Sequence, residues 1–223
     1  MNEAALAREQ MVFEQLEQRG IRDPRLLDAM RKVPRERFVD VETSGEAYGD
    51  HSLPIGEGQT ISQPWIVAHM IQSAAIEPRD RVLEIGAGSG YSAAILGHLA
   101  NRVWTIERQA RLARFSGQRI AMSGLANVTV LRGDGTLGWP PAAPFDAILV
   151  TAAAPRVPDP LRRQLAIEGR LVLPTGEEPE SQRLTRIVRH GADEFSEEDL
   201  GRVAFAPLIG EHGFPEPGAP RRR

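Results

Sequence analysis

Three glycines in alternate positions, at 86, 88 and 90, form the stretch of this sequence with the clearest chemical meaning. An apolar run, residues 82–85, precedes them, and the helix-forming run 93–96 follows. A strand, a tight turn and a helix in this order open a nucleotide-binding α/β fold. Glycine suits a turn that must lie close to a ligand, because it has no Cβ. The stretch therefore predicts a ligand held against a glycine turn.

The spacing of these glycines distinguishes two classes of ligand. A dinucleotide fold uses G-x-G-x-x-G, with the pyrophosphate at the helix N-terminus, whereas the sixth position here is Tyr91. The G-x-G-x-G pattern resembles the first motif of class I S-adenosylmethionine-dependent methyltransferases. The resemblance implies that S-adenosyl-L-methionine is the cofactor; a purely structural glycine turn is the alternative. The residues assigned to the cofactor from this motif are Glu84, Gly86, Ala87, Gly88, Ser89 and Gly90.

Two further acidic positions extend this prediction. Glu107 ends the next predicted strand, about 20 residues after the glycines, where a carboxylate can accept hydrogen bonds from both ribose hydroxyls. An acid placed for the helix dipole is the alternative. Asp134 lies between Gly133 and Gly135, just after a third predicted strand. There it can either form a turn or accept a hydrogen bond from the amino group of an adenine. Together with Arg108, these residues complete the predicted cofactor site.

The elements that must position these residues alternate regularly. We expect strands at 81–85, 102–106, 127–131, 145–150 and 169–173, and helices at 90–100, 108–123 and 158–166. This alternation predicts a doubly wound, mostly parallel, Rossmann-like sheet. The segments 183–190 and 201–206 are predicted as an antiparallel pair at the edge of the sheet.

The N-terminal part differs in character. Residues 4–19 suit an amphipathic helix that presents Leu6, Val12, Phe13 and Leu16 inward and ends at Gly20. A second helix follows Asp23-Pro24, and a third begins at Pro64. Three glycines and two prolines in residues 47–64 predict a long ordered loop. We therefore expect residues 1–75 to form helices and a substrate loop on a core of 76–210, with a flexible tail at 211–223.

Eight stretches of the chain together resemble one family, the protein-L-isoaspartate (D-aspartate) O-methyltransferases. The resemblance covers roughly residues 6 to 210. Residues 59–64, Gln-Thr-Ile-Ser-Gln-Pro, are the most specific part. The stretches are 53–64, 83–91, 103–108, 133–135, 138–140, 145–155, 169–174 and 205–210.

The resemblance implies an activity and an active-site residue. Family members methylate the α-carboxylate of isoaspartyl residues in damaged proteins, and the ester collapses to a succinimide that can reopen to aspartate. Ser62 matches the family's active-site serine; capping the helix at Pro64 is its alternative role. Thr60 and Gln59 are expected in the same pocket, where Thr60 is assigned to the cofactor; a role in scaffolding the loop is the alternative. Gln182 is a weaker candidate for a ligand contact.

Composition limits the other functions. A net charge of −3 and a pI near 6.0 give no sign of nucleic-acid binding, and residues 151–155 lack the N/D-P-P-Y/F motif of base methyltransferases. The chain has no cysteine, and its five histidines show no metal-ligand spacing. We expect no metal, no membrane segment, a cytoplasmic location and a monomer. The rivals are a methyltransferase for RNA or a small molecule and a silent binding module.

Overall fold

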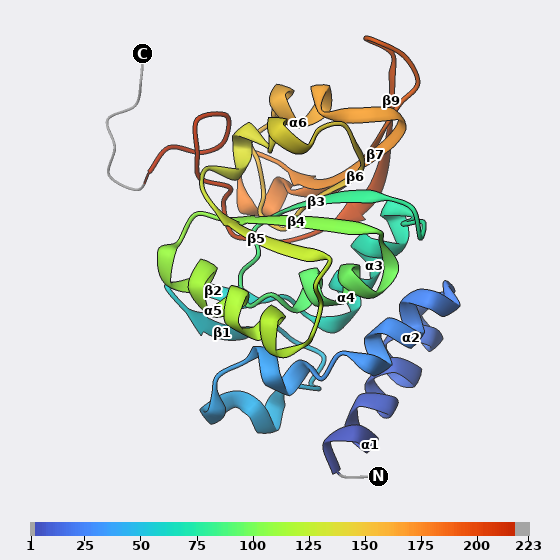
Figure 1. The fold of residues 1–223 in the computed structure, drawn as a ribbon, viewed down its shortest axis with the longest axis vertical. Helices are drawn as coiled ribbons and strands as arrows, with labels where there is room; N and C mark the ends of the chain where they lie inside the picture. Colours follow the sequence, from blue (N-terminus) through green and yellow to red (C-terminus); the bar gives the residue numbers. More distant parts are fainter. Residues whose placement is uncertain (1–2, 217–223) are drawn as a thin grey trace.

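A seven-stranded sheet, in the order β5-β4-β3-β6-β7-β8-β9, runs through the middle of the protein (Figure 1). This computed structural model describes residues 3–216. Strands β3 to β7 are parallel, and β8 and β9 are antiparallel to their neighbours. The predicted fold class is confirmed. The strands are β3 (Arg81–Ile85), β4 (Arg102–Glu107), β5 (Val128–Arg132), β6 (Phe145–Val150), β7 (Leu165–Thr175), β8 (Arg183–Arg189) and β9 (Phe195–Arg202).

The predictions for the last elements were partly wrong. Strand β7 begins at Leu165, so the preceding helix α6 spans only Asp159–Arg163 instead of 158–166. The final strand is 195–202 and not 201–206. Its central residues are Ser-Glu-Glu-Asp. This polar run shows no apolar strand pattern, because the strand lies at an exposed edge of the sheet. Residues 203–206 instead run on without regular structure.

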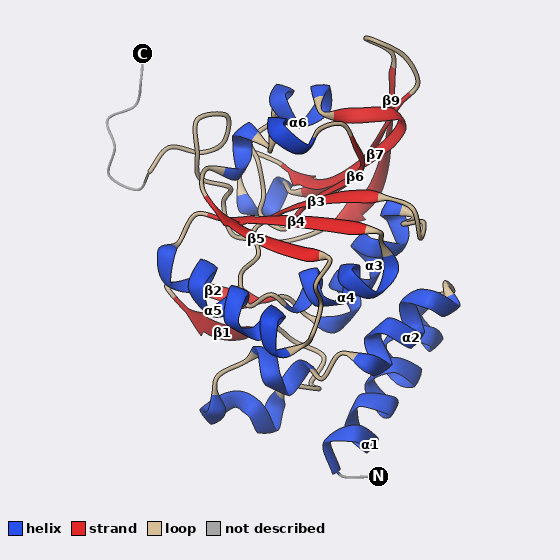
Figure 2. Ribbon diagram, in the orientation of Figure 1, coloured by secondary structure: helices blue, strands red, loops and turns tan. Residues whose placement is uncertain are grey.

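Helices cover both faces of the sheet. In Figure 2, α3 (Pro64–Ala74), α4 (Tyr91–Leu99) and α5 (Ala110–Met122) lie on one side and α6 on the other. Side chains alternate between two buried clusters along each strand: Val82 joins the α3–α4 side, whereas Leu83 joins the α6 side. The central parallel strands β3, β4 and β6 are largely buried on both faces, as their apolar sequences predict, whereas β5 at the sheet edge is more exposed.

The N-terminal segment is less regular than predicted. Helix α1 (Glu3–Gln10) continues as a π-helical turn, Met11–Leu16, and a 3₁₀ turn, Glu17–Arg19. Val12 and Leu16 are buried as expected, but Leu6 and Phe13 are about half exposed, at 51% and 54%. The wide π turn changes the angular spacing of side chains, so the apolar face of a 3.6-residue period is not kept.

The next elements lead to the substrate loop. Helix α2 (Pro24–Lys32) begins as predicted, because the Asp23 carboxylate accepts a hydrogen bond from the Arg25 amide at 2.9 Å. Two 3₁₀ segments follow, Arg35–Phe38 and Val41–Glu46. None of the helices in the described part of the chain is long and apolar enough to cross a membrane.

The segment 47–64 contains a β-hairpin where we predicted a loop without strands. Strands β1 (Leu53–Gly56) and β2 (Gln59–Ile61) pair only with each other. Glu57 and Gly58 have φ values of 53° and 68°, as a type I′ turn requires. The strands have four and three residues, too few for an alternating pattern to be recognised in the sequence.

Candidate active site

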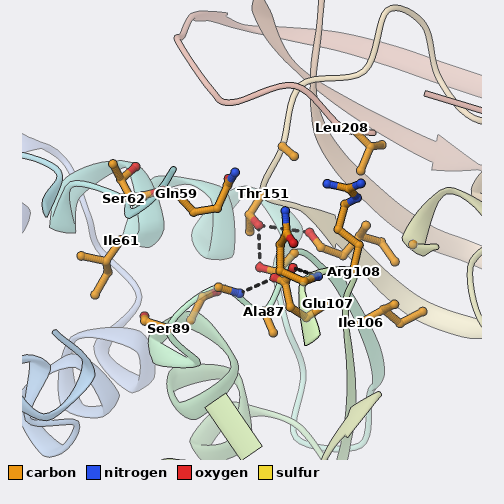
Figure 3. Close-up of a pocket in the computed structure, with 18 of the residues that line it drawn as sticks. Gln59, Ile61, Ser62, Ala87, Ser89, Ile106, Glu107, Arg108, Thr151 and Leu208 are labelled. Carbon is orange, nitrogen blue, oxygen red and sulfur yellow. Dashed lines mark hydrogen bonds between the residues drawn. The ribbon is translucent and has the colours of Figure 1, made fainter. Parts of the chain in front are cut away.

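A cavity of about 370 Å³, the inner cavity, opens at the carboxyl ends of β3, β4 and β6 (Figure 3). The strand order reverses at β3, which pairs with β4 on one side and β6 on the other. Ligands of open α/β sheets bind at such a switch point. The predicted site residues that line the cavity are Thr60, Ser62, Gly86, Ala87, Gly88, Ser89, Glu107, Arg108 and Gly135.

The glycine turn forms one wall of the inner cavity with its backbone. Gly86 has a φ of 95°, which strains any other residue, and a Cβ built there would lie 2.4 Å from Thr151 Oγ1. The Gly86 amide donates to the Ile106 carbonyl at 2.8 Å, and the Thr151 hydroxyl donates to the Gly86 carbonyl at 2.7 Å. The turn is therefore fixed to both neighbouring strands and leaves no room for a side chain at Gly86.

Glu107 presents a carboxylate to the same cavity. It is 6% exposed, and its two oxygens accept one hydrogen bond each, from the Gly88 amide and the Gln109 amide, both at 2.9 Å. A carboxylate oxygen has two lone pairs, so each oxygen keeps one for a ligand. This pair of acceptors suits a vicinal diol such as a ribose, whose two hydroxyls donate.

Glu84, Gly90, Gly133 and Asp134 do not line the inner cavity. The Glu84 carboxyl is completely buried beneath the turn and accepts a hydrogen bond from the Thr105 hydroxyl at 2.5 Å. Burial raises the pKa of Glu84 to about 7. Its position supports the turn from behind, so a direct contact with a ligand does not fit this geometry.

Asp134 faces another part of the chain. Its carboxylate accepts the amide and hydroxyl of Thr136, at 2.9 and 2.7 Å, and the amide of Glu211, at 2.8 Å. Gly210 packs so closely against it that a Cβ there would lie 2.1 Å from Asp134 Oδ1. Asp134 thus binds the backbone of the C-terminal segment. The sequence analysis, which assigned Asp134 to a turn or to the adenine amino group, did not predict this contact.

The C-terminal segment supplies cavity residues to which the sequence reasoning gave no role. Pro207, Leu208 and Ile209 line the inner cavity, and the Leu208 amide donates to the Ala153 carbonyl at 2.7 Å. The stretch 205–210 had been noted in the sequence only as one of the stretches that resemble the family, and not as part of a binding site. Glu216 forms an ion pair with Arg108 at the cavity, and the flexible tail expected at 211–223 stays a prediction. Residues 217–223, with Arg221–Arg223, lie outside the described residues.

Two further residues, Thr151 and Gln182, can be placed relative to the inner cavity. Thr151, to which the sequence reasoning gave no role, lines the inner cavity and closes the glycine turn. Gln182 does not approach the cavity. Its side chain instead donates to and accepts from the Phe205 backbone, at 3.1 and 2.7 Å, and so anchors the extended segment 203–206.

Ser62 lies on the boundary between the inner cavity and a second one. The outer cavity, of about 490 Å³, is lined on one side by residues 50–52 and on the other by residues 202–206. Gln59, Thr60, Ser62 and Thr151 line both cavities. Gln63 and not Ser62 is the N-cap of α3, and the Ser62 hydroxyl has no hydrogen-bond partner among residues 3–216. The alternative capping role is therefore not observed.

No cluster of three or more His, Asp or Glu side chains within the described ranges could hold a metal ion.

The fold, the glycine turn and the carboxylate of Glu107 define a class I S-adenosylmethionine-dependent methyltransferase. Residues 7–213 match the family described as protein-L-isoaspartate(D-aspartate) O-methyltransferase, and the chain belongs to this family.

Individual relatives agree with this assignment. A protein-L-isoaspartate O-methyltransferase of Protochlamydia amoebophila is 54% identical over 204 residues, which cover 92% of this chain and 97% of the relative. Another from Pelobacter propionicus is 54% identical over 207 residues, 93% of this chain and 92% of that one.

Solved structures extend the similarity to the fold. A protein-L-isoaspartate O-methyltransferase aligns with a TM-score of 0.83 and 25% identity, over 92% of this chain and 67% of that one. A Plasmodium falciparum protein described as a putative member, in complex with S-adenosyl-L-homocysteine, aligns with a TM-score of 0.78 and 25% identity over 91% of this chain and 98% of its own.

Proposed function

We propose that this chain transfers the methyl group of S-adenosyl-L-methionine to the α-carboxylate of L-isoaspartyl, and also D-aspartyl, residues in damaged proteins and peptides. The ester then closes to a succinimide, from which normal aspartate is recovered. The observation that carries this proposal is the position of Ser62, on the wall shared by a cofactor-sized cavity and an outer cavity.

The inner cavity has the groups that the cofactor requires. Glu107 would accept hydrogen bonds from the ribose hydroxyls, while the backbone of residues 86–89 would pack against the methionine and ribose portions. Thr60 and Arg108 also line this cavity and would contact the cofactor. When bound, S-adenosyl-L-methionine supplies a methyl group on a sulfonium, which is electrophilic without further activation.

Ser62 would orient the substrate carboxylate. A carboxylate has an unperturbed pKa of about 4 and is ionised at neutral pH, so no general base is required. The Ser62 hydroxyl can donate to one carboxylate oxygen without removing its charge. The second oxygen would accept the methyl group as the methyl–sulfur bond breaks, and S-adenosyl-L-homocysteine would leave as a neutral thioether. Apolar side chains, among them Ile85 and Leu208, line the inner cavity and keep water from the reacting oxygen.

The outer cavity offers a place for the flanking peptide. Ala204 and Ala206 are exposed on its edge, and their backbone amides have no hydrogen-bond partner within the described part of the chain. Backbone groups recognise a peptide without reading its side chains. This suits a repair enzyme that accepts varied sequences around the damaged residue.

The remaining proposals concern the oligomeric state, other partners, the location and the domain bounds. Action as a monomer stays a prediction. Composition supports the absence of a nucleic-acid partner. The cytoplasmic location and the division of the chain at residues 75 and 210 stay predictions.

The first experiment measures transfer from labelled S-adenosyl-L-methionine to an isoaspartyl peptide and to its normal aspartyl twin. Label on the isoaspartyl peptide alone is expected. Equal labelling of both peptides, or of neither, would overturn the proposed reaction in favour of another substrate or a silent module.

The second experiment tests Ser62. We expect Ser62→Ala to lower kcat about 10- to 100-fold, the effect of one hydrogen bond to a charged group, while S-adenosyl-L-homocysteine binds as before in calorimetry. Ser44→Ala, in the exposed segment 41–46 outside both cavities, is the matched control. Unchanged turnover in Ser62→Ala would remove its role.

A further inference from the structure

Arg35 is the largest side chain among those that are fully buried in the described structure, with 0% exposure. Arginine is almost never fully buried unless it is paired. Burial lowers the pKa of the Arg35 guanidinium, but arginine starts so high that the group stays charged. Neither cavity is lined by Arg35, and the mechanism above does not use it. A buried cation outside the site requires an explanation.

Two hydrogen bonds of Arg35 reach the substrate loop. Its Nε donates to the Ala47 carbonyl at 2.7 Å, and Nη2 donates to the Ser62 carbonyl at 2.8 Å. These two carbonyls stand at the two ends of the segment 47–62, which contains the hairpin. A charged donor makes shorter and stronger hydrogen bonds than a neutral one. Arg35 therefore joins the ends of the loop from inside the core.

The same guanidinium also touches the cofactor side. It lies over the ring of Tyr91, with 5.0 Å between Cζ and the ring centroid. Tyr91 directly follows the glycine turn and is itself buried and lines the inner cavity. One side chain thus contacts the residue after the cofactor turn and the backbone of the active-site serine.

We propose that Arg35 is a positioning residue for methyl transfer, which fixes the Ser62 backbone relative to the glycine turn and so keeps the Ser62 hydroxyl between the two cavities. This inference rests on the proposed role of Ser62. A hydroxyl displaced by about 1 Å can cost about 100-fold in rate, even when the displaced group is not the one that was changed. A merely structural arginine would instead lower stability and affect turnover in proportion to the folded fraction.

A double-mutant cycle in the full-length protein separates these roles. Arg35→Met is made in the wild-type and Ser62→Ala backgrounds, and kcat and KM for an isoaspartyl peptide are measured at temperatures where each variant is folded. The Kd for S-adenosyl-L-homocysteine and the thermal midpoint are recorded beside them. Arg170→Met is the control, because Arg170 is also largely buried and donates to two carbonyls, Ala74 and Ala75, outside both cavities.

We expect Arg35→Met to lower kcat about 10- to 100-fold in the wild-type background but less than about 3-fold in the Ser62→Ala background, since coupled residues are not additive. The Kd for S-adenosyl-L-homocysteine should change less than about 3-fold. Arg170→Met should lower the thermal midpoint without this pattern. The same fold loss in both backgrounds, or no loss, would overturn the inference.

Two further results separate a failure of the Ser62 role from a failure of the Arg35 inference. If Ser62→Ala alone retains full turnover, the role of Ser62 fails, whatever Arg35 does. If Arg35→Met does not fold, Arg35→Lys decides the question in the same cycle. Lysine keeps the charge but lacks the planar fork that reaches two carbonyls. If Arg35→Lys lowers kcat in the wild-type background but not in the Ser62→Ala background, the inference is supported. If it lowers kcat equally in both backgrounds, the inference is contradicted.

Discussion

The two walls of the inner cavity are built in different ways. The wall at residues 86–89 and 107–108 is the continuation of parallel strands, and its hydrogen bonds join adjacent strands. The wall at residues 59–62 belongs to a hairpin that pairs with no other strand. Side chains from distant segments hold it instead. The cofactor wall thus takes its geometry from the sheet, whereas the substrate wall depends on a few long-range contacts.

This difference has a chemical consequence. The cofactor wall combines rigid backbone with the buried carboxylate of Glu107, and the Glu84 carboxyl is buried behind this wall. Burial of the two carboxyl groups costs stability. The substrate wall carries no charge and presents two neutral hydroxyls, of Thr60 and Ser62, and the Gln59 amide. Changes in the first wall are therefore expected to alter cofactor affinity and stability, and changes in the second to alter mainly peptide kinetics.

Removal of the Glu107 carboxylate should have the largest effect. Glu107→Ala deletes the acceptor for two ligand hydroxyls and leaves the Gly88 and Gln109 amides unpaired. Two hydrogen bonds to a charged group are worth about 3 kcal/mol or more, so S-adenosyl-L-homocysteine should bind at least about 100-fold more weakly by calorimetry. Glu197→Ala, on the exposed strand β9, is the control. An unchanged affinity would contradict the ribose role.

Glu84→Gln should stabilise the ligand-free protein in a pH-dependent way. Folding raises the pKa of Glu84 from 4.5 to about 7, so the folded protein holds a proton that the unfolded chain releases. Stability falls as the pH rises between these two values. Glu84→Gln should gain about 3 kcal/mol at pH 8 and about nothing near pH 4. Urea unfolding at both pH values measures this, and a difference independent of pH would refute it.

Asp50→Ala should affect the substrate wall alone and more weakly. Its carboxylate accepts hydrogen bonds from Arg19 Nη1 and Gln63 Nε2, both at 2.8 Å, but the side chain is 44% exposed. Exposed pairs are worth at most about 1 kcal/mol. The KM for an isoaspartyl peptide should rise about 5-fold or less, with cofactor affinity retained. Asp159→Ala is the matched control, and a larger change in cofactor affinity than in KM would count against separate walls.

The smallest effect is expected where the hairpin tip meets the cofactor side. Arg111 pairs with Glu57 at 3.5 Å in an exposed position. Arg111→Gln should weaken S-adenosyl-L-homocysteine binding about 2-fold at low salt, and the difference should vanish at about 0.5 M salt, where such pairs are screened. Titrations at two salt concentrations would show it; a difference that persists at high salt would indicate a direct contact with the ligand.

Much of the cofactor wall could be predicted because its signals are local. Apolar runs of five or six residues, the glycines after the first of them and the carboxylate at 107 define strand ends whose common edge follows from the parallel fold. The hairpin could not be predicted, because strands of four and three residues show no period. The polar strand β9 was missed for a related reason, since an exposed edge does not require apolar residues.

The sequence by itself determined the fold class, the glycine turn and the acid at the end of β4, because backbone preferences and strand periodicity act between near neighbours. Only the tertiary structure decided which residues face the cavity. It buried Glu84 behind the turn, turned Asp134 toward Glu211, added residues 207–209 to the lining and placed Arg35 against the Ser62 carbonyl. These contacts join residues 21 to 77 positions apart, and no local pattern encodes them.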